Sequence, residues 1–463
     1  MTTTAIRSNH LRRLIVATTA TCMLAAVALF PSAAPALDTL SARQLEYPLP
    51  LLAPGDRPEV GYEAPTPASA GGVLYVRNDS QPRFTPVPLT LRRAARWRLQ
   101  LEPNDAARLL RATVPARLVH GSRLFYYAVI RDGQGRSVQV PSGGAAAPRS
   151  AWVLSSAKTV PLGVHRFGHA SAPEAVVAKA AAADVSFPTG EPCCGPSSFD
   201  VDRDGSVWLL DGGNQRLLVW RAAHPGSPRA LRVPIPTSDF ALGATGQIYV
   251  AGHCERACVL RLSGSGKKTW QEPFPDAGFP TQLRVGPDGT LYRTRVSESS
   301  GLPWRGRSWT PLTTPAGGPL SVVEQRRHTL WGYQPAGRGL RLVTAFAPYH
   351  EERVALVDNA GHVVHAWRIT SRTKISPALS STPGFVAGDP VITLEAQRGA
   401  GKSFQREYVV LRLAASGARM RLTLREAAWG EIVTDLRVGA DGELYQLATS
   451  PQTGVTVSRF ALD

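Results

Sequence analysis

Cysteine, methionine and long apolar runs are scarce in this chain of 463 residues, which contains only 5 Cys and 3 Met. After residue 36, no apolar run is long enough to cross a bilayer, so no transmembrane span is predicted there. The sequence lacks a Gly-x-Ser-x-Gly elbow, a His-Glu-x-x-His pair and a P-loop, since the segment from Gly399 to Ser403 does not have P-loop spacing. These absences exclude the common signatures of serine hydrolases, zinc peptidases and P-loop nucleotide-binding proteins.

Helical periodicity is nearly absent as well, whereas residues typical of turns are abundant. The chain has 42 Gly and 38 Pro, and short runs rich in Val, Leu, Tyr and Trp lie between them. Such runs, bounded by turn residues, are typical of strands. The composition therefore predicts an all-β protein.

A short hairpin recurs four times along the chain. In the first copy, two apolar runs meet at Asp204-Gly205, which is typical of a tight antiparallel turn. In every copy, an aliphatic and an aromatic residue follow the turn glycine by two and three positions. The first three glycines are 41 and 43 residues apart. The turn glycines are Gly205, Gly246, Gly289 and Gly442.

A period near 40 residues made of four strands indicates a β-propeller blade. A second family of hairpins, at residues 259–270, 354–367 and 409–422, supplies the outer half of a blade. We therefore predict a propeller over residues 173–463, with six blades as the central value and five or seven also allowed. Val176 to Ala180 should complete the last blade, because the chain stops after its third strand and an open ring would leave unpaired edges.

The first blade resembles an NHL-type repeat, in which an Asp-Gly turn and an aliphatic strand precede Asp-x-x-Asn-x-Arg. The matching residues are Asp204-Gly205, the strand from Val207 to Leu210, and Asp211, Asn214 and Arg216. This resemblance implies the propeller fold. It implies no particular activity, because one fold hosts many functions.

A polar residue stands seven positions before each turn glycine, where the innermost strand of a blade begins. That position and the loop between the second and third strands should share one face, around the entrance of the central channel, where a ligand is expected. The placement resembles that of the metal ligands in gluconolactonase-type six-bladed propellers and implies one divalent cation, Ca²⁺ or Zn²⁺, held by oxygens. Alternatively, these side chains line a wet channel and cap loop backbones. The four residues are Ser198, Asp239, Gln282 and Asp435.

Four cysteines remain after the N-terminal segment, and they form two pairs. Cys193 and Cys194 precede the first blade, whereas Cys254 and Cys258 lie in the loop between the second and third strands of the next blade. The two pairs should be neighbours on one face. An even number of cysteines in an exported chain predicts disulfides linking one pair to the other. A zinc site on four thiolates, joined by His253, is the alternative.

Residues 1–36 are typical of an export signal, with three arginines, an apolar run from Leu14 to Phe30 and an Ala-Pro-Ala cleavage site at 34–36. The pair Arg12-Arg13 leaves open general or twin-arginine export. We predict a secreted, extracellular bacterial protein. The alternative is a chain tethered to the membrane by an uncleaved anchor.

Three segments separate the signal from the propeller. Residues 37–72 are rich in Pro and Ala and are predicted to be an extended lead-in, and residues 73–144 should hold six or seven strands, typical of a β-sandwich of immunoglobulin or fibronectin-III type. Residues 145–172 are predicted to be a linker. His165 and His169 are spaced like a helical metal pair, but glycines surround them, so we assign them to the linker.

The formal net charge is +17. Because the arginines are scattered rather than interleaved with aromatics, no specific nucleic-acid partner is predicted. A basic exported protein should instead associate with anionic wall polymers. Two functions remain open: a non-enzymatic binding or scaffold protein that recognises a protein or glycan on the propeller face, or a metal-dependent hydrolase or lyase at the channel entrance.

Overall fold

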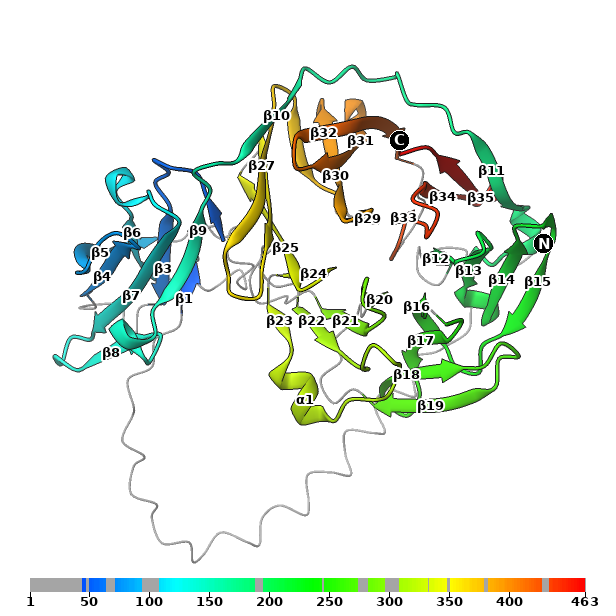
Figure 1. Ribbon diagram of the computed structural model, residues 1–463, viewed down its shortest axis with the longest axis horizontal. Helices are drawn as coiled ribbons and strands as arrows, with labels where there is room; N and C mark the ends of the chain where they lie inside the picture. The colour runs from blue at the N-terminus through cyan, green and yellow to red at the C-terminus, as the bar shows by residue number, and fades with distance from the viewer. Residues whose placement is uncertain are drawn as a thin grey trace, which may run out of the picture. The chain divides into compact units, whose positions relative to one another are not determined.

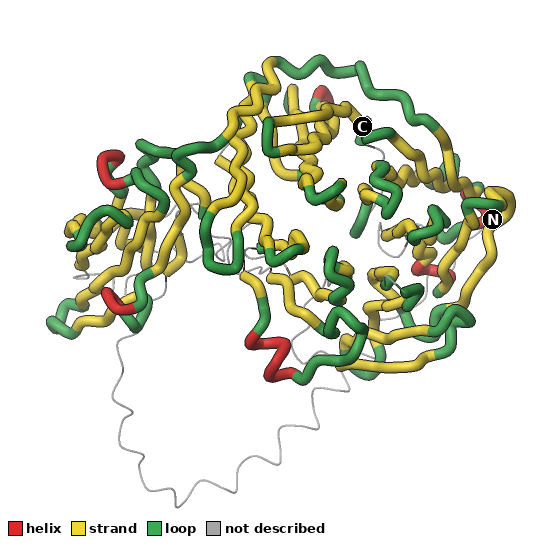
Figure 2. The backbone as a smooth tube through the Cα atoms, in the orientation of Figure 1, coloured by secondary structure: helices red, strands yellow, loops and turns green. Residues whose placement is uncertain are grey.

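The computed structural model describes residues 44–46, 50–63, 71–93, 108–187, 195–243, 245–273, 282–295, 308–331, 333–347, 350–378, 382–426 and 433–462. The predicted export signal, Cys193 and Cys194 lie outside these residues. Strands dominate the regular structure, as Figure 2 shows. No helix within the described ranges is long and apolar enough to span a membrane.

The N-terminal part of the chain forms one strongly curled sheet, in the order β1-β3-β6-β5-β4-β7-β9-β2, with β8 paired to β7. The first half of β5 pairs with β4 and its second half with β6, so β5 belongs to both halves of the sheet. The strands are β1 (Gln44–Glu46), β2 (Leu51–Leu52), β3 (Glu59–Glu63), β4 (Gly71–Asn78), β5 (Thr85–Arg93), β6 (Arg108–Thr113), β7 (Arg123–Arg131), β8 (Ser137–Val140) and β9 (Arg149–Val153).

Side chains from both halves of this sheet share one core. Tyr62 in β3 and Leu110 in β6 pack in the same buried cluster as Val76 in β4 and Leu124 in β7. The alternating burial along β7 follows from the two-residue period of a strand. The strands β4 to β8 account for five of the six or seven strands predicted between 73 and 144. The sheet begins earlier than predicted, because β1 to β3 fall in the expected lead-in, and its immunoglobulin or fibronectin-III identity stays a prediction.

The rest of the chain forms six sheets arranged around a common axis, which confirms the six-bladed propeller (Figure 1). The first three blades are β12 (Pro196–Val201), β13 (Val207–Asp211), β14 (Arg216–Arg221) and β15 (His224–Arg232); β16 (Thr237–Leu242), β17 (Ile248–His253), β18 (Ala257–Leu262) and β19 (Lys268–Pro273); and β20 (Gln282–Val285), β21 (Leu291–Arg295), β22 (Ser308–Pro311) and β23 (Leu330–Trp331).

The last three blades are less regular. They are β24 (Gln334–Gly337), β25 (Leu340–Ala347), β26 (Glu351–Val357) and β27 (Val363–Ser371), with β10 (Lys158–Gly163) as a fifth strand; β28 (Lys374–Pro377), β29 (Gly384–Val386), β30 (Asp389–Arg398), β31 (Gln405–Ala414) and β32 (Gly417–Arg425); and β33 (Leu436–Val438), β34 (Leu444–Ser450), β35 (Gly454–Phe460) and β11 (Ala175–Ala180). We number the blades 1 to 6 in this order.

The repeated hairpin joins the first two strands of blades 1, 2, 3 and 6, as predicted. Its turn glycines have φ between 78° and 85°, a left-handed conformation that glycine adopts without a steric penalty. The aromatic residue of the repeat supports the turn, since Trp208 Nε1 donates to Asp202 Oδ2 at 3.0 Å and the Tyr445 hydroxyl donates to Asp441 Oδ2 at 2.6 Å. The repeated position of the aromatic residue therefore has a local structural cause in these two blades.

The ring is closed by β11, which pairs antiparallel with β35 from Val176 opposite Ser458 to Ala180 opposite Val455. This confirms the prediction that Val176 to Ala180 completes the last blade. Buried side chains then join blades 6 and 1, including Leu447 from β34 and Phe199 from β12. An N-terminal strand thus supplies the edge that the C-terminal blade lacks.

The segment predicted to be a linker contributes strands to both parts of the chain. Its residues 149–153 form β9 in the N-terminal sheet, and β10 pairs parallel with β27 at the outer edge of blade 4. Another departure is the helix α1 (Val322–Arg327), because helical periodicity is nearly absent from the sequence. The helix begins with a capping box, because Ser321 Oγ accepts from the Glu324 backbone while the Glu324 carboxylate accepts from the Ser321 backbone.

A buried arginine joins the N-terminal sheet to blade 4. Arg353 in β26 is 5% exposed. Its guanidinium donates to the Leu51 carbonyl at 3.1 Å and forms ion pairs with Asp56 and Glu351. The Trp152 indole also donates to the Gly361 carbonyl at 2.9 Å. Polar and apolar contacts therefore hold the two sheets together.

Candidate functional site at the channel entrance

The four predicted site residues occupy equivalent places at the start of the inner strands. Ser198 lies in β12 opposite Leu210, Asp239 in β16 opposite Ala251, and Gln282 in β20 opposite Thr294, while Asp435 directly precedes β33. All four are buried, with Ser198 and Asp239 0% exposed, Asp435 1% and Gln282 8%. The predicted register is therefore present, but these side chains are enclosed by protein rather than solvated.

Asp239 is surrounded by donors from blades 1 and 3. Its Oδ1 accepts from the Ser198 hydroxyl at 2.6 Å, and its Oδ2 accepts from the Leu283 backbone N–H at 2.7 Å. The Arg284 guanidinium lies 3.4 Å from Oδ2. Burial raises the pKa of Asp239, and the Arg284 charge and these hydrogen bonds oppose that rise. The carboxylate joins three blades and uses both of its oxygens to do so.

Arg284 also reaches from blade 3 to blade 6. One guanidinium nitrogen donates to Thr434 Oγ1 at 2.7 Å, next to Asp435 in the chain, and another donates to the Leu283 carbonyl at 2.7 Å. Gln282 adds a second link, because its side-chain amide donates to the Val433 carbonyl at 3.1 Å. A cation of the protein itself therefore stands between the positions of Asp239 and Asp435.

Arg284 and its counterpart Arg437 are functional-site residues that the sequence analysis missed. Both follow the repeated polar position by two residues, and the equivalent residue in blade 1 is Asp200. Asp200 Oδ1 lies 3.5 Å from Arg437 Nε, and Asp200 Oδ2 accepts from the Leu242 backbone N–H at 3.1 Å. The signal was present as opposite charges at one register of the repeat. It could be interpreted only once the ring had placed blade 6 beside blade 1.

Asp435 differs sharply from Asp239. Neither of its carboxylate oxygens has a hydrogen bond of ordinary length and angle within the described residues, although the residue is buried. The Tyr408 phenol, in β31 of blade 5, is its neighbour: burial, then the Asp435 charge and a side-chain hydrogen bond with Asp435, raise the pKa of Tyr408. Asp435 is thus a buried carboxylate beside one phenol donor.

The described residues contain no cluster of three or more His, Cys, Asp and Glu side chains able to hold a metal ion. Of the proposed oxygen ligands, the Asp239 carboxylate accepts from Ser198 and the Leu283 N–H and lies beside Arg284, while the Gln282 side-chain amide donates to the Val433 carbonyl. A hard divalent cation needs several oxygens from one site. The proposed ligand set therefore fits a cation poorly, and the site stays a prediction.

Asp211, from the NHL-like motif, fixes the conformation of the loop between the second and third strands of blade 1. Its Oδ2 accepts from Asn214 Nδ2 at 2.8 Å and from Arg216 Nε at 2.9 Å, and its Oδ1 accepts from the Ser186 backbone N–H at 3.0 Å. The side chain is fully buried. This explains the Asp-x-x-Asn-x-Arg spacing as a local fixation of a loop.

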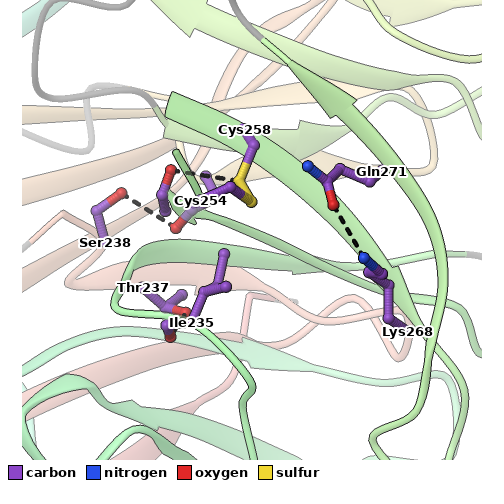
Figure 3. Close-up of a disulfide and its surroundings, with 9 residues drawn as sticks. Ile235, Thr237, Ser238, Cys254, Cys258, Lys268 and Gln271 are labelled. Atoms are coloured by element: carbon purple, nitrogen blue, oxygen red, sulfur yellow. Dashed lines mark hydrogen bonds between the residues drawn. A yellow bond between two sulfur atoms is a disulfide. The ribbon is translucent and has the colours of Figure 1, made fainter. Parts of the chain in front are cut away.

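Cys254 and Cys258 form a disulfide with each other. The bond closes the connection between β17 and β18, close to Thr237 and Ser238 at the start of β16 (Figure 3). The prediction that these two cysteines bond with Cys193 and Cys194 is therefore wrong. Gly252 lies opposite Cys258 and His253 opposite Ala257, so the tight connection after His253 leaves the Cα atoms of Cys254 and Cys258 only 6.0 Å apart.

Comparisons with known proteins add the fold alone. No family model matches the chain, and no curated protein matches it. Similar solved structures include Kuenenia stuttgartiensis hydrazine synthase (14% identity, 56% of this chain, 76% of that chain, TM-score 0.35) and Staphylococcus aureus virginiamycin B lyase (11%, 73%, 91%, 0.28). The PQQ-bound aldose sugar dehydrogenase of Streptomyces coelicolor is another (11%, 62%, 98%, 0.36). At these values the likeness carries no argument about activity.

Proposed function

We propose that the protein is an exported, non-enzymatic binding protein that recognises its partner with propeller loops on the channel-entrance face. The observation that carries the proposal is the saturation of Asp239 by Ser198, the Leu283 N–H and Arg284. A catalytic or metal-binding carboxylate needs acceptors that face the ligand, whereas this one is used to join blades. The side chains at the channel entrance then hold the blades together, and the loops around the entrance bind the partner.

Charge supports the same proposal. The formal net charge of +17 favours association with anionic polymers outside the cell, through long-range attraction that weakens as salt increases. The separate N-terminal sheet fits a spacer or adhesive module. Export is part of this proposal and rests on the sequence of residues 1–36.

The second candidate is a metal-dependent hydrolase or lyase of the gluconolactonase-like kind. The observation that favours it is Asp435, a buried carboxylate whose two oxygens form no hydrogen bond of ordinary length and angle in the described part of the chain and whose neighbour is the Tyr408 phenol. A cation bound there would supply a counter-charge to a buried carboxylate. The two candidates therefore differ in whether Asp435 binds a divalent cation.

Calorimetric titration of chelator-treated protein with Ca²⁺ and Zn²⁺ separates them. The compared proteins are the wild type, Asp435→Asn and, as a matched control, Asp204→Asn, which changes an exposed turn residue of blade 1. The binding-protein proposal predicts no stoichiometric cation in any of the three. One cation per chain in the wild type and in Asp204→Asn, lost in Asp435→Asn, would replace it with the enzyme proposal.

A further inference from the structure

A second polar site lies on blade 5, away from the channel entrance. A cavity of about 680 Å³ opens between the chain segment that follows β10 and the ends of β30, β31 and β32. Its lining includes Phe167, Phe404, Arg398, Arg406, Glu407 and Arg425. The loop between β30 and β31 borders it, so it lies on the face that also carries the channel entrance.

The floor of the cavity is fixed by a buried imidazole–carboxylate pair. His165 Nε2 lies 2.7 Å from Glu407 Oε2, and Glu407 Oε1 accepts from the Gly168 backbone N–H at 2.8 Å. The His165 backbone N–H donates to Thr373 Oγ1 at 2.8 Å. His165 and Glu407 are each 7% exposed. Both carboxylate oxygens of Glu407 are therefore engaged by protein groups, and His165 is a positioning residue rather than part of a free linker.

The strand register places two arginines on the same side of the sheet as Glu407. Arg398 lies opposite Gln405 and Glu407 opposite Arg425, and cross-strand partners share a face of a sheet. Gln405 and Glu407 are two residues apart in β31, so they too share that face. Arg398, Gln405, Glu407 and Arg425 consequently form one polar row along the cavity.

These two guanidinium groups have no carboxylate partner among the described residues. Arg398 lies over the Phe167 ring, with Cζ 4.4 Å from the ring centroid, and its Nε donates to Gln405 Oε1 at 2.7 Å. The third arginine of the cavity, Arg406, is neutralised by an ion pair with Glu426. Both Arg398 and Arg425 are exposed. The cavity therefore presents two guanidinium groups that form no ion pair among the described residues, beside a Glu407 carboxylate that His165 and the Gly168 N–H already engage.

An exposed aromatic ring borders the same cavity. Phe404 follows the short turn Gly401–Ser403 and is 45% exposed, one of the few large apolar side chains exposed to this degree in the described residues. Arginine and exposed aromatic side chains together are typical of binding surfaces. A ligand with both an anionic group and an apolar part would satisfy both features.

We propose that this cavity binds an anionic ligand, whose carboxylate or phosphate group is held by Arg398 and Arg425 while its apolar part packs on Phe404. Guanidinium groups suit these anions because their planar N–H donors match two acceptor oxygens. The inference rests on the proposed binding function, because both place the ligand on the same face of the propeller. It adds the chemical class of the ligand. A small molecule and an acidic polymer both carry such a group, and the probes below separate these two sources.

The test is calorimetric titration of the full chain with benzoate and phenyl phosphate, with benzyl alcohol as the neutral probe. Arg398→Gln and Arg425→Gln each remove one guanidinium, and Arg419→Gln, an exposed arginine at the other end of β32, is the matched control. We expect both acids to bind, Arg419→Gln to behave as the wild type, and each of the other variants to weaken binding by about tenfold, the value for one charge-assisted hydrogen bond. Unchanged thermal unfolding shows that each variant is folded.

Two results would overturn the inference: acids that bind no better than benzyl alcohol, or Arg398→Gln and Arg425→Gln variants that bind them as well as the wild type does. Sedimentation with polyglycerol phosphate then identifies the source, because a polymer ligand is retained by the wild type and released by the same two variants. A polymer that all variants retain equally shows that it binds elsewhere. The cation titration measures binding at Asp435, which is a different site. A failure of the anion-binding inference can therefore be distinguished from a failure of the proposed function.

Discussion

Asp239 and Asp435 have the same amino-acid type, the same place in the repeat and nearly the same burial, yet opposite surroundings. Asp239 in blade 2 receives donors from Ser198, the Leu283 backbone and Arg284. Asp435 in blade 6 has no hydrogen bond of ordinary length and angle in the described residues, and its neighbour is the Tyr408 phenol of blade 5. The difference arises from the neighbouring blade, because Leu283 and Arg284 follow Asp239 around the ring, whereas blade 1 presents the Ser197 carbonyl, an acceptor, to the backbone N–H groups of Val433 and Thr434 in blade 6. A repeated position therefore acquires its role from the next blade.

The largest effect should come from Asp239→Asn. An amide in place of the carboxylate loses one acceptor and leaves Arg284 without its buried counter-ion, so we expect a loss of about 3 to 5 kcal/mol in the free energy of unfolding. Denaturant unfolding measures it, with the exposed Asp204→Asn as the control that should stay within about 0.5 kcal/mol of the wild type. Equal stability of both variants would remove the distinction between Asp239 and a surface carboxylate.

Glu352 sharpens the comparison because it is a third buried carboxyl group, 4% exposed, whose Oε2 has no partner in the described residues. Burial raises the pKa of Glu352 to about 8. A carboxyl group with a raised folded-state pKa stabilises the fold fully below its unfolded pKa and loses that contribution as pH rises toward 8. Glu352→Gln should therefore match the wild type near pH 4 and exceed its stability by roughly 4 kcal/mol near pH 9.

Unfolding curves of the wild type and Glu352→Gln across this pH range provide the measurement. Glu395→Gln is a useful comparison variant, because the pKa of Glu395 is also raised by burial but Ser376 and Gln397 donate to its carboxylate. We expect a smaller pH dependence at that position. A constant difference between wild type and Glu352→Gln at all pH values would contradict the assigned titration.

The disulfide in blade 2 should have an intermediate effect. Cys254→Ser together with Cys258→Ser opens a loop with a sequence separation of 4, and chain entropy predicts a loss of about 2 kcal/mol for so short a closure. Thermal unfolding of this variant checks the size of the effect. Peptide mapping under non-reducing conditions checks the pairing, and a fragment linking Cys254 to Cys193 or Cys194 would contradict it.

The smallest effect is expected for Asp435→Asn. This substitution keeps the shape of the side chain and one oxygen that can accept from Tyr408, so stability should change by less than about 1 kcal/mol. Denaturant unfolding at neutral pH compares it directly with Asp239→Asn. A loss as large as that of Asp239→Asn would mean that the fold depends on the Asp435 carboxylate as much as on that of Asp239.

The fold could be predicted to a large extent because its main signal is local. A glycine at a left-handed turn position and an aromatic residue three positions later recur in four blades, and both are required by one hairpin. Blades 4 and 5 lack that hairpin, so their boundaries were open. The strand β10 could not be predicted as part of blade 4, because its partner β27 lies more than two hundred residues later in the chain.

The candidate site could be located but not interpreted from the sequence. The repeat placed Ser198, Asp239, Gln282 and Asp435 at one register, and the structure confirms that placement. Whether a carboxylate at that register is free or saturated depends on a neighbouring blade, as Arg284 shows by reaching both Asp239 and Thr434. The blade 5 cavity carries no repeat signal at all, since His165 and Glu407 meet only through tertiary packing.

A double-mutant cycle on Asp239 and Arg284 tests the central claim most directly. The stabilities of the wild type, Asp239→Asn, Arg284→Gln and the double variant are measured by denaturant unfolding under identical conditions. If the Asp239 carboxylate is committed to holding the ring together, the two substitutions are coupled by about 1 to 3 kcal/mol, because each removes the same buried interaction. Additivity within about 0.5 kcal/mol would contradict the claim and would leave the Asp239 carboxylate available as a metal ligand.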